Sequence, residues 1–293
     1  MSATLMATRR PRWNEKLAYL TYRIRRSPLT MAGLAITFIV LLCMIFAPWL
    51  ASHDPNALNL AERLVPPSST HWFGTDEVGR DLFSRVLFGS QQSVGVGLFV
   101  AFASCFIGGL LGCFSGVVGG RFDALIMRLM DIMLSVPSLV LIMALAAALG
   151  ASLFNAMLAI TLVRIPSYVR LARGQALSIR EMGYVKAAQT FGAGRWHVVH
   201  WHVARNAMPP LLVQLSLDIG SAILMASALG FIGLGAQQPT AEWGAMVATG
   251  RNYILDNWWY STFPGLAILI TATGFNLLGD GVRDLLDPRQ QGK

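Results

Sequence analysis

The chain has 293 residues, of which 54% are hydrophobic and only 13% are charged. This balance is too apolar for a soluble globular domain and predicts an all-α integral membrane protein with several spans. The formal net charge of +8 is no sign of nucleic-acid binding unless the basic residues share one face. The three cysteines lie inside apolar runs, so we interpret them as small buried hydrophobic residues.

Residues 1–28 carry seven basic residues against a single acidic one. Apolar side chains recur there at helical spacing, at Trp13, Leu17, Leu20 and Ile24. This pattern indicates an amphipathic helix on an anionic membrane face, with a solvated basic tail as the alternative. No cleaved signal peptide is expected, because the apolar run that follows has the length of a full membrane span.

Six apolar stretches are predicted to cross the membrane, since about 20 apolar residues span its hydrocarbon core. They are residues 29–50, 93–119, 134–149, 154–171, 211–234 and 264–278. A polar extracytoplasmic segment, residues 51–92, separates the first two. The remaining five form a core over residues 93–282, and residues 283–293 form a cytoplasmic tail.

Several residues refine the ends of these spans. A charged helical stretch at 121–133 leads into the third span, where Pro137 is expected to bend the helix. Pro264 is expected to open the sixth span, just after an interfacial belt of three aromatic residues. The belt consists of Trp258, Trp259 and Tyr260. Gly279 and Gly281 are predicted to end the last helix.

The basic residues are distributed unequally between the two sides that six spans would define. Nineteen of the 23 Lys and Arg residues lie on the side of the termini, and only four lie on the other side, at Arg63, Arg80, Arg85 and Arg251. Because cytoplasmic loops are enriched in Lys and Arg, this predicts that both termini are cytoplasmic. The positive charge is therefore a signal of topology.

The sequence contains none of the short motifs that mark common catalytic or nucleotide-binding sites. It lacks a G-x-x-x-x-G-K-[ST] phosphate loop, an H-E-x-x-H pair, a C-x-x-C pair and a G-x-S-x-G elbow. We therefore expect a protein that is not an enzyme, with no catalytic residues and no bound metal or cofactor.

The stretch at 184–210, YVKAAQTFGAGRWHVVHWHVARNAMPP, is basic, amphipathic and rich in small residues. Ala187 and Ala188 favour a helix that another protein can approach closely. Gly192 can adopt the left-handed conformation that ends a helix, and a second helix is predicted to end at Pro209. From the residues alone, an ordinary amphipathic surface loop is the alternative.

This stretch resembles the cytoplasmic coupling loop of ABC importer permeases, here residues 176–208. The family pattern is Glu-Ala-Ala, three residues, Gly, nine residues and then a hydrophobic-x-hydrophobic-Pro ending. Lys186 stands where Glu is usual, and Arg205 stands where Pro is usual. The resemblance implies that an ATPase subunit contacts Tyr184, Lys186, Ala187, Ala188, Phe191, Gly192 and Arg195.

The segment 71–93, HWFGTDEVGRDLFSRVLFGSQQS, predicts a short helix on the extracytoplasmic membrane surface. Thr75 or Asp76 can cap that helix, and Gly89 can end it. The run G-T-D-x-x-G-R-D-x-x-S-R resembles one permease subunit of the dipeptide, oligopeptide and nickel importers. Such a segment could help to dock a solute-binding protein through Asp76, Arg80 and Asp81, or it could be a lid that packs on the spans.

Residues 228–244 and 263–288 resemble the same family, and the likeness covers roughly residues 20–288. The close spacing of Gly230, Gly233 and Gly235 would let helix backbones approach one another, either at a seam between subunits or in simple helix packing. Within the family, the stretches at 155–239 resemble the permeases of D,D-dipeptide importers most.

The resemblance implies an inner-membrane permease of the type I ABC importer fold. It implies a second, homologous permease subunit, two ABC ATPase subunits that use ATP and Mg²⁺, and an extracytoplasmic solute-binding protein. Membrane lipid is a further partner and nucleic acid is not. Ordinary dipeptides, oligopeptides or nickel remain alternative cargoes, because the binding protein usually selects the cargo.

Two further groups of residues invite a functional interpretation. Asp218 lies inside the fifth predicted span and Arg164 interrupts the fourth, so the two could line a path for zwitterionic peptides or form a structural ion pair. His197, His200 and His202 suggest a metal site, but His202 points away from the other two on a helix. Polar contacts with the ATPase or with lipid headgroups are the preferred role for these histidines.

Two other classes of protein were weighed against the permease. A secondary transporter driven by an ion gradient would need several acidic residues inside the membrane, and Asp218 is the only clear one. A membrane enzyme would need a nucleophile and a base, which no motif supplies.

Overall fold

A computed structural model describes residues 27–286. Five helices longer than 20 residues make up most of this part of the chain: α2 (Pro28–Leu50), α3 (Leu82–Val118), α6 (Leu153–Arg180), α9 (Arg205–Phe231) and α11 (Trp259–Leu286). The shorter elements are η1 (Leu60–Glu62), α4 (Gly120–Leu134), α5 (Ser138–Leu149), α7 (Gly183–Thr190), α8 (Arg195–His197), the π-helical η2 (Val198–Ala204), α10 (Trp243–Gly250) and η3 (Arg251–Tyr253). The predicted amphipathic helix within residues 1–28 and most of the predicted tail fall outside the described residues.

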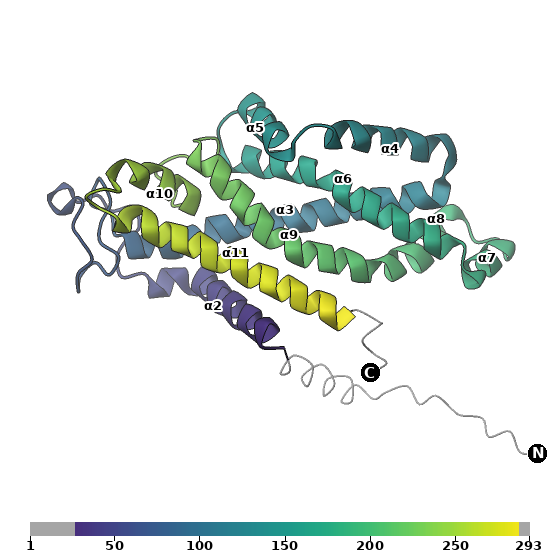
Figure 1. The fold of residues 1–293 in the computed structure, drawn as a ribbon, viewed down its shortest axis with the longest axis horizontal. Coiled ribbons are helices and arrows are strands. Elements are labelled where there is room, and N and C mark those ends of the chain that lie inside the picture. The colour runs from purple at the N-terminus through teal and green to yellow at the C-terminus, as the bar shows by residue number, and fades with distance from the viewer. Residues whose placement is uncertain (1–26, 287–293) are drawn as a thin grey trace, which may run out of the picture.

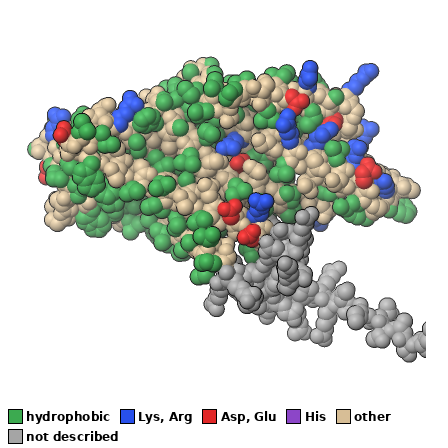
Figure 2. All heavy atoms as spheres, viewed as in Figure 1, with side chains coloured by type: hydrophobic (Ala, Val, Ile, Leu, Met, Phe, Trp, Pro, Cys, Tyr) green, Lys and Arg blue, Asp and Glu red, His purple; other side chains and the backbone are tan. Residues whose placement is uncertain are grey.

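The long helices run along the longest dimension of the molecule (Figure 1). The helix α7 lies at one end, which we call the α7 end; α2 begins and α11 finishes nearer the middle of the molecule, each at its own end that is closer to α7. The helix α10 and the connection 51–81 lie at the opposite end, which we call the α10 end. Figure 2 shows Lys and Arg side chains gathered mainly toward the α7 end, with hydrophobic side chains over much of the remaining visible face.

Four helices of residues 27–286 are long and apolar enough to cross a membrane: Pro28–Leu50, Leu82–Val118, Arg195–Phe231 and Trp259–Leu285. The pair α4 and α5 passes the same test only when taken together, and it is bent by 92° at the break near Pro137. The helix α6 does not pass, and it carries Arg164, Arg170, Arg173 and Arg180. Length and composition therefore support four or five spans rather than the six that were predicted.

Three helix boundaries differ from those predicted. Asp81, not Thr75 or Asp76, caps a helix, and this helix continues from Leu82 to Val118 without ending at Gly89. The predicted surface helix and second span are therefore parts of one element. The second helix of the stretch at 184–210 likewise does not end at Pro209, since α8, η2 and α9 form a continuous helical run to Phe231.

The helix α11 also extends beyond its predicted limits. It begins at Trp259, five residues before Pro264, and it continues through Gly279 and Gly281. A Cβ atom at Gly281 would lie 2.3 Å from Thr30, so this glycine allows α11 to pack against α2 instead of ending the helix. The predicted aromatic belt is reduced to Trp258, because Trp259 and Tyr260 are buried.

A row of glycines lets α3 pack closely on α6. Gly108, Gly112 and Gly116 recur every four residues on one side of α3, as neighbours on a helical face must. A Cβ atom at Gly112 would lie 2.4 Å from the carbonyl oxygen of Val169, and one at Gly116 would lie 2.6 Å from Cβ of Ala176. Small residues at these positions allow the two backbones to approach, as is typical of helix pairs in membranes.

Two of the three glycines at 230–235, Gly230 and Gly235, serve close contacts within the chain. A Cβ atom at Gly230 would lie 2.4 Å from Oε2 of Glu242, the residue that caps α10. Glu242 is buried and accepts hydrogen bonds from the backbone of Gly244 and Ala245 and from Ser93 Oγ. Burial raises the pKa of this carboxyl group. These contacts hold α10 against α3 and α9.

Candidate functional site

The segment predicted to couple to an ATPase forms α7 and the turn that follows it, at the tip of the α7 end (Figure 1). One side chain, Val185, anchors α7. It is fully buried and packs in a cluster with Ile179, Val199 and Val203. Because α7 is only eight residues long, this anchor and the flanking turns hold it in place.

Gly192 ends α7 in the way the sequence predicts. Its φ of 89° lies in the left-handed region, which glycine adopts without the Cβ penalty of other residues. Its N–H donates to the carbonyl of Gln189, and the N–H of Ala193 donates to that of Ala188. The prediction of a helix, a glycine turn and a second helix is therefore confirmed.

Most of the predicted coupling residues are exposed. Phe191 is 90% exposed and Tyr184 is 46% exposed. Lys186, Ala187, Gly192 and Arg195 are also exposed, and Ala188 is half-buried. Trp196, which the prediction did not include, is 67% exposed. Exposed aromatic side chains beside small residues form a surface that a partner protein can cover.

Lys186, which departs from the family pattern, is paired within the chain. Its Nζ atom lies 3.0 Å from Oε2 of Glu181, and Arg180 Nε lies 3.3 Å from Oε1 of the same carboxylate. The hydrogen bond from Lys186 holds the pKa of Glu181 below its usual value. Both side chains are exposed, so solvent screens this pair.

Arg164 and Asp218 meet between α6 and α9. Arg164 Nη1 lies 3.5 Å from Asp218 Oδ1, and Arg164 Nη2 donates to Ser221 Oγ at 2.8 Å. Gln214 Nε2 donates to the same Asp218 oxygen at 3.2 Å. Asp218 is only 4% exposed; its Oδ1 meets these partners, and its Oδ2 is buried without a hydrogen-bond partner among the described residues. The geometry is that of an ion pair joining two helices of one chain.

The residues proposed to dock a binding protein are buried, which corrects that assignment. Asp76, Arg80 and Asp81 are each less than 5% exposed. Arg80 Nε donates to Asp76 Oδ2 at 2.5 Å, and Arg80 Nη1 donates to Gln238 Oε1 at 2.9 Å. Because every one of these charges is engaged inside the protein, the three side chains shape the connection 51–81 and cannot themselves form a contact surface.

Other residues at the α10 end are exposed and apolar. They are Leu58, Leu60, Trp72, Ile254, Leu255 and Trp258, of which Leu255 is 94% exposed. Of these residues only Trp258 was predicted from the sequence, because single apolar residues in a connection carry no periodic signal. If a partner covers the α10 end, these side chains are better suited to contact it than the buried charges.

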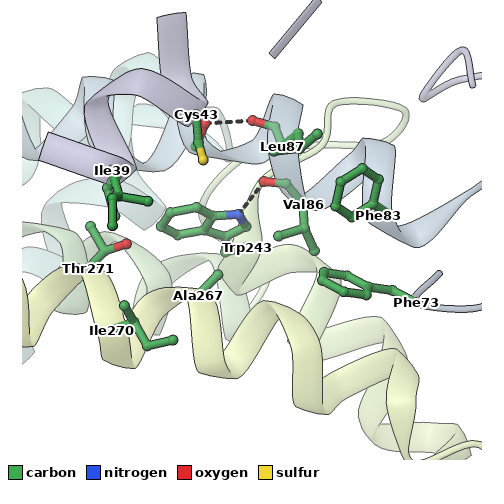
Figure 3. Close-up of a pocket in the computed structure, with 12 residues that line it drawn as sticks. Ile39, Cys43, Phe73, Phe83, Val86, Leu87, Trp243, Ala267, Ile270 and Thr271 are labelled. Atoms are coloured by element: carbon green, nitrogen blue, oxygen red, sulfur yellow. Dashed lines mark hydrogen bonds between the residues drawn. The ribbon is translucent and has the colours of Figure 1, made fainter. Parts of the chain in front are cut away.

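The pocket drawn in Figure 3 lies between α2, α3 and α11 and has a volume of about 240 Å³. Trp243 extends along it, and its Nε1 donates to the carbonyl of Val86 at 2.9 Å. The lining is almost wholly apolar, with Ile39, Phe83 and Ile270 among its residues. A zwitterionic peptide would find no partner for its charges there, so this pocket is not a suitable cargo site.

A second hollow is open and more polar. It lies at the α10 end between the last turn of α9 and η3, with a volume of about 560 Å³. Arg251 forms one wall, and its guanidinium lies 4.9 Å from the ring centre of Phe231. This places one of the four cations of the α10 end beside an open cavity.

The histidines of the second helical run are not gathered into a site. His197 and His200 are exposed and His202 is half-buried. The ring centres of His197 and His202 are 5.8 Å apart, and His200 contacts Trp201. No carboxylate or thiolate of the described residues joins them in a group that could hold a metal ion.

Comparison with known proteins identifies the chain. The family model described as "N-terminal TM domain of oligopeptide transport permease C" matches residues 18–67. The chain is 70% identical to the probable D,D-dipeptide transport system permease protein DdpC of Escherichia coli, over 94% of this chain and 93% of that protein. It is 42% identical to the dipeptide transport system permease protein DppC of Alkalihalophilus pseudofirmus, over 92% of this chain and 88% of that protein.

A third relative is the di/tripeptide transport system permease protein DppC of Pseudomonas aeruginosa, which is 44% identical over 88% of both chains. The model of the binding-protein-dependent transport system inner membrane component matches residues 108–292 of this chain. That match contains the α3–α6 seam, the ion pair of Arg164 and Asp218, and α7. The chain therefore belongs to the family of binding-protein-dependent transport system inner membrane components, and it is a multi-pass membrane protein.

Proposed function

We propose that this chain is the permease subunit of an ATP-driven ABC importer that moves short peptides, with D,D-dipeptides as the cargo. The observation that carries the proposal is α7, a short helix anchored by the buried Val185 that presents Phe191 at 90% exposure. The names of the relatives, all of them peptide permeases, support the cargo class.

Four kinds of partner follow from this function. A second, homologous permease subunit completes the path, two ABC ATPase subunits grip the coupling segments, and an extracytoplasmic binding protein delivers the peptide. Membrane lipid surrounds the spans. ATP and Mg²⁺ are used by the ATPase subunits, and this chain contributes no catalytic group.

The proposed orientation places the α7 end and both termini in the cytoplasm. The excess of Lys and Arg on that side supports it. Six crossings are reached if α6 and the bent pair α4 and α5 each traverse the membrane. The helix α6 has 28 residues, a length of about 42 Å at 1.5 Å per residue, and its arginines are stabilised by partners such as Asp123, Asp131 and Asp218.

The proposed mechanism is mechanical. When the ATPase subunits close on ATP, they displace α7, and the rigid helical run from Arg195 to Phe231 carries the motion toward the α10 end. The spans then rock between inward-open and outward-open states, two packings of the same helices. The sequence of α7 fits this role because the buried Val185 attaches α7 to the helical run from Arg195 to Phe231, which must move with it.

Replacement of Phe191 by Ser tests the coupling role. We expect peptide uptake by the reconstituted complex to fall about thirtyfold, as for an interface residue worth about 2 kcal/mol. The melting temperature of the isolated permease pair should change little, because Phe191 makes few contacts within the chain. Uptake at the wild-type rate would contradict the proposal.

The matched control is Phe38→Ser on α2, which removes another exposed phenylalanine, 63% exposed, far from α7. It should leave coupling intact. A cysteine placed at residue 191 should also form a cross-link to the ATPase subunit in the complete complex. Absence of that cross-link in an active complex would count against the same contact.

The ion pair of Arg164 and Asp218 remains a proposed part of the cargo path, and Asp218→Ala tests it. If the charges serve the path, uptake falls while the complex still assembles and its ATPase stays coupled. If the pair only joins α6 to α9, the variant yields less assembled complex. Size-exclusion chromatography of the purified complex, beside an uptake assay, separates the two results.

The cargo is tested through the binding protein that serves this permease. Calorimetric titration with D-Ala-D-Ala, an L-dipeptide and Ni²⁺ should give the tightest binding for D-Ala-D-Ala. Preference for L-dipeptides or for nickel would reject the D,D-dipeptide assignment while leaving the permease function in place. Uptake that persists with an inactive ATPase would instead favour an ion-coupled transporter.

A further inference from the structure

Three segments of the α10 end bring together two imidazoles and a carboxylate. His53 follows the end of α2, His71 lies in the connection 51–81, and Asp81 caps α3. His71 Nδ1 lies 2.9 Å from Asp81 Oδ1, and His53 Nδ1 lies 3.9 Å from Asp81 Oδ2. The two imidazole ring centres are 4.8 Å apart. One ligand atom from each residue lies within 4.8 Å of the other two.

We propose that His53, His71 and Asp81 form a binding site for a divalent transition-metal ion of the zinc class. Two imidazole nitrogens and one carboxylate oxygen are donors that suit Zn²⁺, whereas Ca²⁺ and Mg²⁺ prefer oxygen ligands alone. Three protein ligands leave a fourth position for water. Solvent reaches the site because the side chain of His53 is 42% exposed.

The surroundings of His71 match those of a metal-binding histidine. Its Nδ1 lies 2.9 Å from Asp81 Oδ1, and its Nε2 lies 3.5 Å from Oε2 of Glu62. Histidines that bind metals through one ring nitrogen commonly donate the other N–H to a carboxylate, which fixes the ring. Glu62 is placed to accept that hydrogen bond when Nδ1 binds the ion.

Asp81 is held in place before any ion arrives. Its Oδ2 accepts hydrogen bonds from Ser84 N at 2.8 Å and from Ser84 Oγ at 2.7 Å. The backbone N–H of His53 donates to the same Ser84 hydroxyl at 3.1 Å. The dipole of α3 opposes a cation at this end of the helix, and the carboxylates of Asp81 and Glu62 offset that repulsion.

Only a small movement is needed to complete the site. Ligand atoms at about 2.1 Å from a tetrahedral zinc ion lie about 3.4 Å from one another. The 3.9 Å between His53 Nδ1 and Asp81 Oδ2 is longer than this, and the 2.9 Å between His71 Nδ1 and Asp81 Oδ1 is shorter. His53 is the exposed member of the three, so its side chain can move the ångström or so that would bring its ring nitrogen within reach of the same ion as His71 and Asp81. The bound ion would join the end of α2 to the start of α3 and would stabilise the connection between them.

The experiment is a calorimetric titration of ZnCl₂ into the purified complete complex in lipid nanodiscs, after treatment with a chelator. We expect one zinc-binding event in the wild type that weakens by about tenfold or more in His53→Ala. Because His53 is exposed, this variant should fold normally. His71→Ala should also weaken the event, and Glu62→Gln should weaken it less.

The matched control is the triple variant His197→Ala, His200→Ala and His202→Ala, which removes the other histidines and should keep the event. Zinc should raise the melting temperature of the wild type and of this control, but not that of His53→Ala. Equal zinc affinity in the wild type and in His53→Ala overturns the proposal. So does loss of the event in the triple variant alone.

Discussion

The two ends of the molecule differ in how they use their charged residues. At the α10 end, the charged side chains of Asp76, Arg80 and Arg85 are buried and paired. At the α7 end, Phe191 and Trp196 are left exposed. The α10 end pairs its charges within the chain and leaves apolar side chains such as Leu255 exposed, whereas the α7 end exposes charged and aromatic side chains together.

The difference follows from backbone structure. The connection 51–81 has little regular structure, so side chains must satisfy its backbone groups. Thr75 Oγ1 accepts from the N–H of Val65, and Asp76 Oδ1 accepts from the N–H groups of Val78 and Arg80. The backbone of α7 is satisfied by its own helix, so its side chains are free to face outward. Substitutions in the α10 end, which is built from loops, are therefore expected to lower the stability of the protein. Substitutions in α7 are expected to change transport more than stability.

The largest expected effect is from Asp76→Ala at the α10 end. It would leave Arg80 and Arg85 buried without their shared carboxylate, which typically costs about 3 to 5 kcal/mol. Thermal unfolding of the purified complex and its abundance in membranes measure this loss. The control Asp54→Ala removes an exposed acid of the same connection and should change stability by less than about 0.5 kcal/mol. Similar losses for both variants would contradict the contrast between the ends.

A pair of glycines compares the two ends with the same substitution. Gly79 has φ of 78° and Gly192 has φ of 89°. A Cβ atom at Gly79 would lie 1.8 Å from the carbonyl oxygen of Asn59, whereas none of the structure lies within 4 Å of one at Gly192. We expect Gly79→Ala to cost about 2 to 5 kcal/mol and Gly192→Ala only the conformational part, about 1 to 2 kcal/mol. Equal shifts in melting temperature would show that the clash at Gly79 is relieved by movement.

The smallest effect is expected from Lys186→Glu, which introduces the residue usual in the family pattern. It breaks the exposed pair with Glu181, so uptake should change by less than about threefold, and salt should reduce the difference. The exchange variant, with Glu181→Lys added, should restore the wild-type rate. A larger loss that persists at high salt and in the exchange variant would mean that Lys186 contacts the ATPase directly.

The span count shows where prediction from hydropathy reaches its limit. The apolar runs at 29–50 and 211–234 fall largely in helices that are long and apolar enough to cross a membrane, as their composition predicts. Arginines interrupt α6, and the break near Pro137 divides the third predicted span at 92°. Whether such segments cross the membrane depends on whether their charged side chains are paired with buried partners. The apolar content of the sequence does not reveal those partners.

The candidate functional site likewise has a part that the sequence predicted and a part that it did not. The sequence predicted the turn at Gly192 because only backbone conformation is involved. It left Asp76, Arg80 and Asp81 either in a surface that docks a solute-binding protein or in a lid that packs on the spans. All three are buried, and Arg80 finds one of its partners in Gln238, which lies more than 150 residues away in the chain. The gathering of His53, His71 and Asp81 likewise has no sequence signal, because the connection 51–81 must fold back on itself to create it.

The sequence by itself determined that this is a helical membrane protein, which ends carry its basic residues, and where the glycine turn after α7 falls. These properties depend on composition and on local conformation, and both can be taken from neighbouring residues. Only the tertiary structure decided which charges are buried, that α3 is one continuous helix from Leu82 to Val118, and that the glycines of α3 face α6. Those outcomes depend on contacts between segments that are distant in the sequence. The free energies of such contacts cannot be estimated from the pattern of neighbouring residues.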